Sequence, residues 1–200
     1  MPVSYCINLN DAEQSELKAL LRQVLNNAVT YKKLIMPAAP TSPNLLTPKA
    51  CFVTLYSGEK LRGCIGTYTA DQPLWENVCR YTYYSACEDP RFTPITPDEL
   101  DCIHFEISIL SDLLPIANDG EQTLLRQLKV GTDGLLLKEN YRSAIFLPSV
   151  WHVLTTPIEF VQALKQKGGW PADYWHKSIQ LYRFSASMIK GFVTVKGFDD

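Results

Sequence analysis

Residues 51–68 read CFVTLYSGEKLRGCIGTY and predict a β-hairpin, so this part of the chain is expected to form part of a β-sheet. Two strand-like runs, 51–56 and 61–68, flank the four residues SGEK, so we expect a four-residue loop. The second run contains Gly63 and Gly66, and each glycine in a strand costs about 0.5–1 kcal/mol relative to alanine. Such a cost indicates that something, a ligand or another backbone segment, approaches the Cys64 face of this strand closely.

Arg62 and Cys64 lie two residues apart on this strand, which places both side chains on one face, roughly 7 Å apart. A guanidinium at that distance would favour the thiolate, which is the reactive form of cysteine. Cys64 is therefore a candidate nucleophile with Arg62 as its stabilising charge. The alternative is structural, with the glycines accommodating a tight strand or bulge and Cys64 filling a gap in the core.

Helices are predicted on both sides of the hairpin. Asp11 and Gln14 mark the start of an amphipathic helix over about 11–34, which should pack on a sheet through its apolar stripe. The side chains expected to make that contact are Leu17, Leu21 and Val24. The following segment, 36–49, has four prolines and predicts an ordered loop, and Pro73 opens a second helix.

Residues 102–110, CIHFEISIL, alternate strictly and predict a strand with one apolar and one polar face. The polar face carries Cys102, His104, Glu106 and Ser108. Histidine and carboxylate are general acid–base groups, so His104 and Glu106 are candidates for moving protons. The alternative is the solvated outer face of an antiparallel sheet, which gives the same alternation.

The motif DPRF at 89–92 has two interpretations of equal weight. Asp89 could accept hydrogen bonds from nearby amides and make a structural clasp, with Phe92 filling the core. Alternatively, Arg91 could bind an anionic ligand through its planar, bidentate guanidinium. Arg142, in a later hairpin, is a weaker candidate for the same role.

The second half of the chain repeats the order of hairpin and helix. A helix near 120–128 leads to a hairpin over 134–148. A Thr-Pro-x-Glu cap at 156–159 then starts a helix that ends at the glycines 168–169, and a last strand is expected over 180–187. The repeat predicts an α+β fold of two subdomains, with mainly antiparallel sheets, packed helices and a cleft between them. Clefts are common ligand sites, so a small molecule could bind there.

Composition narrows the classes of function. The 200 residues have a formal net charge of −2, which argues against nucleic-acid binding, and there is no apolar run long enough for a membrane span. The first ten residues lack the features of a signal peptide. Six cysteines occur without a C-x-x-C pair, so we expect reduced thiols in a cytoplasmic protein, no disulfides, no metal site and no cofactor.

The ordered motifs LRGCIG, PLWENV, EDPRFTPITPDELD, FEISILS and GLLLKENYRSAIFLPSV resemble the AMMECR1 family, whose prokaryotic members are called AmmeMemoRadiSam system protein A. The resemblance covers about residues 12–187, and it implies that residues 1–200 form one domain made of two subdomains. It implies a cleft lined in part by the RGCIG strand, and partners that are a Memo-like protein and a radical SAM protein. The family positions matched here are Arg62, Gly63, Cys64, Ile65, Gly66, Asp89, Arg91, Phe92, Ser108, Leu147 and Pro148.

Two hypotheses follow for the function. In the first, the chain is a cysteine-dependent component of that modification system, with Cys64 as nucleophile or acceptor and Glu106 or His104 moving protons. In the second, it is a binding module that holds a ligand or docks partners without chemistry of its own. Many relatives carry a cysteine where this chain has Lys165, so no mechanism that needs a second thiol is expected.

Overall fold

The computed structural model describes residues 7–193, so Cys6 lies outside the described part of the chain. Two compact units are present. Among the described residues, the discontinuous unit comprises Ile7–Leu110 and residues 187–193, and the inserted unit comprises Ser111–Ala186. Each unit combines helices with a four-stranded antiparallel sheet, which confirms the predicted α+β fold. The predicted cleft between subdomains stays a prediction.

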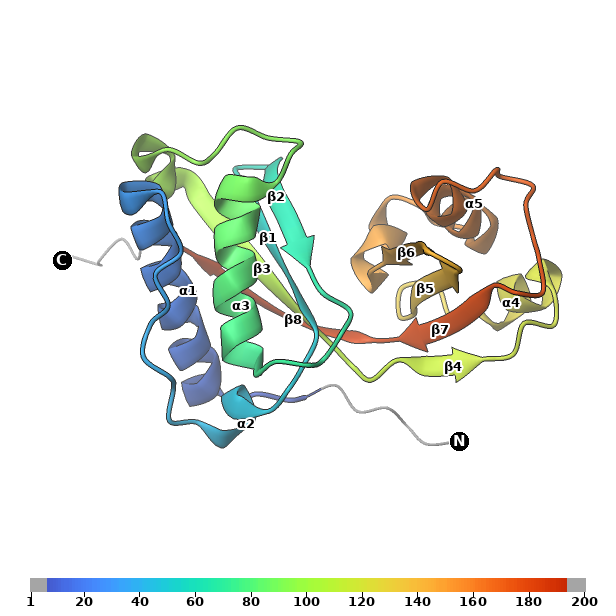
Figure 1. The fold of residues 1–200 in the computed structure, drawn as a ribbon, viewed down its shortest axis with the longest axis horizontal. Helices are drawn as coiled ribbons and strands as arrows, with labels where there is room; N and C mark the ends of the chain where they lie inside the picture. Colours follow the sequence, from blue (N-terminus) through green and yellow to red (C-terminus); the bar gives the residue numbers. More distant parts are fainter. Residues whose placement is uncertain (1–6, 194–200) are drawn as a thin grey trace. The chain divides into compact units, whose positions relative to one another are not determined.

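In the discontinuous unit, two helices cover one face of the sheet (Figure 1). The strands, in sheet order, are β2 (Lys60–Gly66), β1 (Cys51–Ser57), β3 (Ile103–Leu110) and β8 (Ala186–Phe192). The helices are α1 (Asp11–Tyr31) and α3 (Leu74–Tyr83), and a short α2 (Pro43–Leu46) lies in the proline-rich loop. A π-helical turn over Tyr84–Glu88 continues α3, and a 3-10 helix over Pro97–Cys102 precedes β3.

Helix α1 begins one residue after its cap, Asn10. The Asn10 side chain accepts a hydrogen bond from the Glu13 amide (3.0 Å), and the Glu13 carboxylate accepts one from the Asn10 amide (2.9 Å). The helix ends three residues earlier than predicted because Lys32 adopts a left-handed conformation with φ 54°. Leu17 and Leu21 pack in the sheet core as predicted, whereas Val24 packs beside Cys79 of α3.

The hairpin has a tighter turn than its sequence indicated. Ser57 and Lys60 still pair across the strands, so the connection is a two-residue turn that contains Gly58 at φ 56°. The pairing then shifts by one residue between Leu55 and Tyr56, which makes a β-bulge in β2. This bulge displaces Arg62 from the simple alternation that the sequence suggested.

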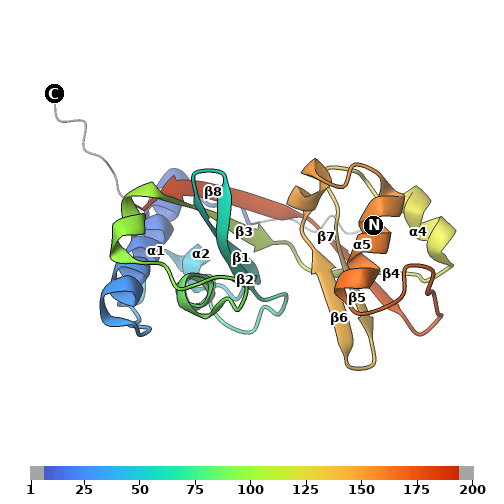
Figure 2. The ribbon, with the colours of Figure 1, turned by 90° about the horizontal axis from the view of Figure 1, so that it is seen from above.

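The inserted unit has its own sheet and core, and Figure 2 shows its β5–β6 hairpin beside α5. Its strands, in sheet order, are β4 (Leu114–Ile116), β7 (Gln180–Phe184), β5 (Gly134–Glu139) and β6 (Arg142–Phe146). Its helices are α4 (Glu121–Gln127), α5 (Pro157–Lys167) and a 3-10 turn over Pro148–His152. The core joins Phe160 and Leu164 of α5 to apolar side chains of the sheet.

The last predicted strand, 180–187, is wrong as a single element. The backbone changes sheets at Ser185, so that β7 completes the inserted unit and β8 completes the discontinuous unit. Ser185 and Ser111 mark the crossing, because the Ser111 amide donates to the Ser185 carbonyl oxygen at 2.9 Å. The Ser185 amide in turn donates to the Ser111 hydroxyl at 3.0 Å.

Candidate functional site

A row of polar side chains crosses the sheet of the discontinuous unit on the face opposite α1 and α3. The strand register sets Cys64 opposite Thr54 and Thr54 opposite Glu106. Lys190 of β8 completes the row, with its Nζ 2.6 Å from Glu106 Oε1. We call Cys64, Thr54, Glu106 and Lys190 the polar row. It brings a thiol, a hydroxyl, a carboxylate and an ammonium group into one line over four strands.

Aromatic side chains run beside the polar row. Tyr56 lies opposite His104, and their rings stack with centroids 5.1 Å apart and an interplanar angle of 11°. Phe192 extends the group, with its centroid 5.9 Å from that of His104. Burial raises the pKa of Tyr56, and the nearby Glu106 carboxylate and Cys64 raise it further. The two predicted proton-moving residues, His104 and Glu106, therefore lie on the same face of the sheet as Cys64, but on β3, with β1 between them and β2.

Cys64 is held through both its side chain and its backbone. The Thr54 hydroxyl donates to Cys64 Sγ at 3.3 Å. The Cys64 amide donates to Asp89 Oδ2 at 2.9 Å, and its carbonyl oxygen accepts from Arg91 Nη2 at 3.1 Å. Both backbone groups point to the free edge of β2, so Asp89 and Arg91 take the place of a neighbouring strand there.

The DPRF motif thus has the geometry of the clasp. Asp89 is almost fully buried. Its carboxylate accepts hydrogen bonds from Nε and Nη2 of Arg91 at 2.9 and 2.7 Å and from the Arg91 amide at 3.2 Å. These hydrogen bonds hold the pKa of Asp89 at about 2, with those from the Arg91 side chain the largest cause. The Arg91 side chain remains 55% exposed, so its charge also faces solvent.

Arg62 is paired with Glu99. Its Nε lies 2.7 Å from Glu99 Oε1, and its Nη2 donates to Glu99 Oε2 at 3.1 Å and to the Thr93 carbonyl oxygen at 3.3 Å. The ion pair holds the pKa of Glu99 at about 2. The expected arrangement, in which the guanidinium stabilises Cys64, differs from this one because the bulge in β2 turns Arg62 towards Glu99.

The glycines of β2 accommodate neighbouring protein atoms. A Cβ on Gly63 would lie 1.9 Å from the Ser85 carbonyl oxygen, and a Cβ on Gly66 would lie 2.3 Å from the Cys51 carbonyl oxygen. Gly63 pairs with Leu55, so its close contact is on the helix-covered face of the sheet, not on the face of Cys64 as expected. Other backbone segments therefore do approach this strand closely, and the segment next to Gly63 is the π-helical turn after α3.

Ser85 belongs to that turn and joins the two strands of the hairpin. Its hydroxyl accepts from the Ile65 amide at 2.9 Å and donates to the Val53 carbonyl oxygen at 2.8 Å. Because Val53 and Ile65 are partners in the register, the hydroxyl bridges a backbone pair of the sheet. Gly63 lets this turn come close enough for the bridge to form.

Arg142 belongs to a different place in the fold. It lies on β6 of the inserted unit, where its Nη1 donates to the Gly169 carbonyl oxygen at 2.9 Å and its guanidinium lies 5.7 Å from the Tyr141 ring centroid. Lys165 is buried in the same unit, with its Nζ 2.6 Å from Glu121 Oε1. Neither residue shares the sheet that carries Cys64.

Sequence reasoning missed Thr54, Tyr56 and Lys190 as members of the site. Thr54 and Tyr56 could have been found, because the alternation in 51–56 sets them on the face away from the buried Val53 and Leu55. Lys190 carried no such signal, since it lies beyond the last predicted strand. Its place beside Glu106 arises from pairing between β3 and β8, far apart in sequence.

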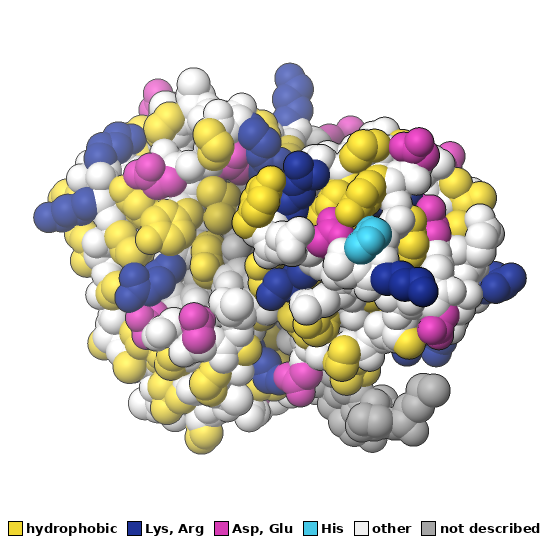
Figure 3. Space-filling model, turned by 45° about the vertical axis from the view of Figure 1, so that its right-hand side comes forward, with side chains coloured by type: hydrophobic (Ala, Val, Ile, Leu, Met, Phe, Trp, Pro, Cys, Tyr) yellow, Lys and Arg dark blue, Asp and Glu magenta, His cyan; other side chains and the backbone are white. Residues whose placement is uncertain are grey.

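Other classes of site have little support in residues 7–193. This part of the chain contains no group of three or more His, Cys, Asp or Glu side chains arranged for a metal ion, and its five cysteines are free thiols. None of its helices has the length and hydrophobicity needed to cross a membrane. On the face shown in Figure 3, basic and acidic side chains are interspersed.

Comparison with known proteins gives a consistent set of relatives. A family model described as AMMECR1 matches residues 18–189. Protein MJ0810 of Methanocaldococcus jannaschii is 33% identical over 177 residues, covering 84% of this chain and 85% of the relative. Protein Ta0236 of Thermoplasma acidophilum is 34% identical over 173 residues, covering 84% and 82%. The crystal structure of protein PH0010 from Pyrococcus horikoshii superposes with a TM-score of 0.83 at 32% identity, covering 91% of this chain and 93% of that one.

Proposed function

Because the chain belongs to the AMMECR1 family, we propose that it is a cytoplasmic component of a modification system with Memo-like and radical SAM partners, in which Cys64 is a reactive thiol. The observation that carries this proposal is the polar row. A thiol, a hydroxyl and a carboxylate at neighbouring positions of one sheet face provide a nucleophile and a proton acceptor.

The chemistry of the polar row divides among its members. The Thr54 hydroxyl donates to Cys64 Sγ, and a donated hydrogen bond stabilises negative charge on the sulfur. Glu106 is the carboxylate of the row and lies one strand beyond Thr54, so in this scheme it accepts the thiol proton through the Thr54 hydroxyl and not by direct contact. Lys190 balances the carboxylate charge through its 2.6 Å contact, while His104 provides a second proton acceptor beside Tyr56.

The test is the rate of alkylation of each cysteine, resolved by peptide mass spectrometry between pH 6 and 9. Cys102 is exposed and serves as an internal reference thiol in the same molecule. We expect Cys64 to react faster than Cys102 at pH 7, and Thr54→Val to slow Cys64 while leaving Cys102 unchanged. Equal or slower reaction of Cys64 in the wild type would remove the reactive-thiol role.

A second function is favoured by the pairing of Arg62 with Glu99 and of Arg91 with Asp89. Both guanidinium groups form ion pairs with carboxylates. These ion pairs hold the two side chains in fixed positions, as a rigid binding surface requires. In this alternative the chain is a module that holds a small ligand or docks its partner proteins without chemistry of its own.

Partner binding separates the two functions. Native mass spectrometry of the chain mixed with a purified Memo-like protein should show a complex under either function. Cys64→Ala keeps the complex and abolishes modification if the thiol is reactive, and it leaves both unchanged if the chain is only a binding module. Absence of any complex would count against the proposed partner.

A further inference from the structure

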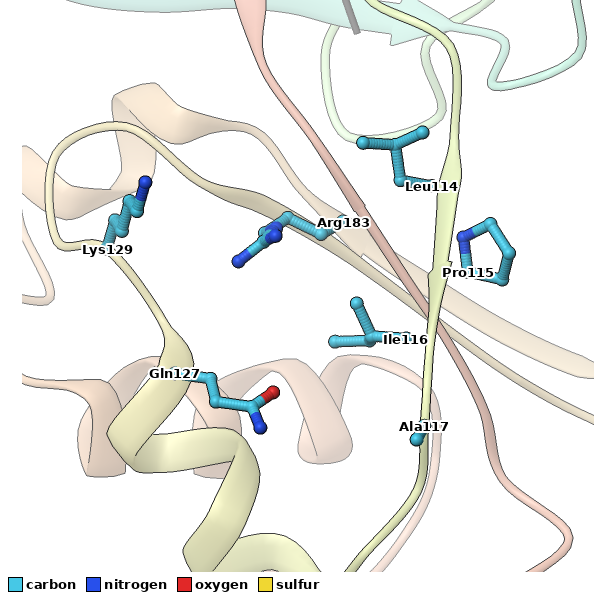
Figure 4. A pocket seen from close by; sticks show the side chains of 7 residues that line it. All are labelled: Leu114, Pro115, Ile116, Ala117, Gln127, Lys129 and Arg183. Carbon is cyan, nitrogen blue, oxygen red and sulfur yellow. The ribbon is translucent and has the colours of Figure 1, made fainter. Parts of the chain in front are cut away.

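A pocket lies in the inserted unit, beside the edge strand β4 of its sheet. It has a volume of about 790 Å³, within the range of about 300–1,000 Å³ that is usual for ligand pockets. Figure 4 shows Leu114 and Ile116 of β4 and Arg183 of β7 extending into it from the sheet, while Lys129 lies across the pocket from them. The pocket therefore combines apolar side chains with two basic ones.

Arg183 is at an unusual position for a charged residue. The register sets it opposite Leu114 on one side and opposite Leu135 on the other, and Leu135 is fully buried in the core. The face of β7 that carries Arg183 is thus the face that packs the core of the inserted unit. A cation at such a position needs anionic or hydrogen-bonding partners, because desolvation otherwise disfavours it.

The partners provided by the protein are incomplete. Arg183 Nη1 lies 3.7 Å from Asp133 Oδ2, which is beyond hydrogen-bonding distance, and the Arg183 side chain is 26% exposed. Within residues 7–193 the Arg183 guanidinium forms no hydrogen bond with the protein, and the Lys129 ammonium forms neither a hydrogen bond nor an ion pair. Two cations and one carboxylate leave a net positive charge in this pocket.

Asp133 positions both cations. Its Oδ2 accepts a hydrogen bond from the Lys129 amide at 2.8 Å, which ties down the loop after α4 that carries Lys129. Its own carbonyl oxygen accepts from Trp151 Nε1 at 2.7 Å, and its side chain is nearly buried. The loop that carries Lys129 is therefore anchored through Asp133 to the core of the unit.

We propose that this pocket binds a small organic carboxylate with an aliphatic body. The carboxylate would take the free N–H donors of Arg183, whose planar guanidinium matches a carboxylate in a bidentate way, and the charge of Lys129 would add to the attraction. The aliphatic body would lie against Leu114 and Ile116. This ligand site belongs to the inserted unit and does not depend on the chemistry proposed for Cys64.

The test uses four probes that separate charge from apolar contact. Hexanoate has both features, hexanamide keeps the chain without the charge, acetate keeps the carboxylate without the chain, and inorganic phosphate is an anion without apolar atoms. Binding is measured by isothermal titration calorimetry. Methyl shifts of Leu114 and Ile116 in NMR spectra locate the bound probe. We expect hexanoate to bind about tenfold more tightly than any of the other three.

Three variants test the role of the cations. Arg183→Met should weaken hexanoate binding by about tenfold or more, because it removes charge-assisted hydrogen bonds. Lys129→Met should weaken it several-fold, and this exposed residue can be replaced without disturbing the core. Arg126→Met is the matched control, since it removes one exposed cation from α4 outside the pocket lining and should leave binding unchanged.

Each contrary result would overturn the proposal. Equal affinity for hexanoate and hexanamide would show that the pocket does not recognise charge. Equal affinity for hexanoate and phosphate would show that it does not recognise the aliphatic body. Wild-type affinity in the folded Arg183→Met and Lys129→Met variants would place binding elsewhere. These outcomes leave the alkylation of Cys64 untouched, so they are separate from the test of the proposed function.

Discussion

Replacement of Asp89 by asparagine should destabilise the protein by an amount that depends on pH. The Asp89 side chain is only 2% exposed and accepts hydrogen bonds from the Cys64 amide and from Arg91. These contacts lower its pKa from the ordinary value of 3.8 to about 2. At 1.36 kcal/mol for each pKa unit, this difference corresponds to about 2 kcal/mol of folding free energy at pH 7.

The direction of the pH dependence of stability follows from the lowered pKa of Asp89. A carboxylate whose pKa is lowered by folding stabilises the protein fully above its unfolded value, and that stabilisation is lost as pH falls towards the folded value. We therefore expect the wild type to lose about half of the Asp89 contribution, or about 1 kcal/mol, between pH 7 and pH 3. The amide of the Asp89→Asn variant cannot titrate, so the gap between the two proteins should narrow over that range.

Urea denaturation at pH 7 and pH 3 measures both quantities. Glu99 and the other carboxyl groups titrate in both proteins, so the difference between the proteins isolates Asp89. Glu88→Gln is the control, because Glu88 is exposed and accepts only a 3.2 Å hydrogen bond from Tyr83 among the described residues, and it should change stability by less than about 0.5 kcal/mol. A difference in unfolding free energy between wild type and Asp89→Asn of less than about 0.5 kcal/mol at pH 7, or a difference that is the same at both pH values, would contradict this prediction.

Three further predictions concern stability. Gly63→Ala should cost about 1–3 kcal/mol in urea denaturation, because its Cβ would lie 1.9 Å from the Ser85 carbonyl oxygen; a melting point at or above that of the wild type would contradict this. Lys165→Met should destabilise by about 1–3 kcal/mol, and adding Glu121→Gln should restore most of the loss, since the pair is 2.6 Å apart and Lys165 is buried; additive losses would argue against a coupled pair. Glu139 accepts hydrogen bonds from a serine, an indole and a phenol that lower its pKa, so wild-type stability should fall as pH drops below about 4.5, and Glu139→Gln should lack this part of the pH dependence in a urea series.

The two faces of β3 could be predicted because strand alternation is a local property. Ile103 and Phe105 pack in the core, while His104 and Glu106 lie on the opposite face, as the sequence indicated. Their partners could not be predicted, because pairing between β3 and its neighbours brings together residues that are distant in sequence. Lys190 is the clearest example.

Arg62 shows how a single backbone irregularity defeats a local rule. The expectation that positions i and i+2 share a face is sound for a regular strand. The bulge in β2 inserts one residue opposite Tyr56, and Arg62 then pairs with Glu99. Gly63 was a correct signal for close approach, yet the sequence alone could not identify Ser85 as the neighbour.

The order of the chain also has a consequence for its synthesis on the ribosome. The discontinuous unit is left after Leu110 and resumed at Ser187, so β8 is made only after the whole of Ser111–Ala186. At ribosomal rates of about 5–20 residues per second, the edge of β3 that β8 will cover stays unpaired for several seconds. An unpaired strand edge is a template for association with other chains. The nascent protein is therefore most prone to aggregate during translation of the inserted unit, and termination just before β8 would leave that edge open permanently.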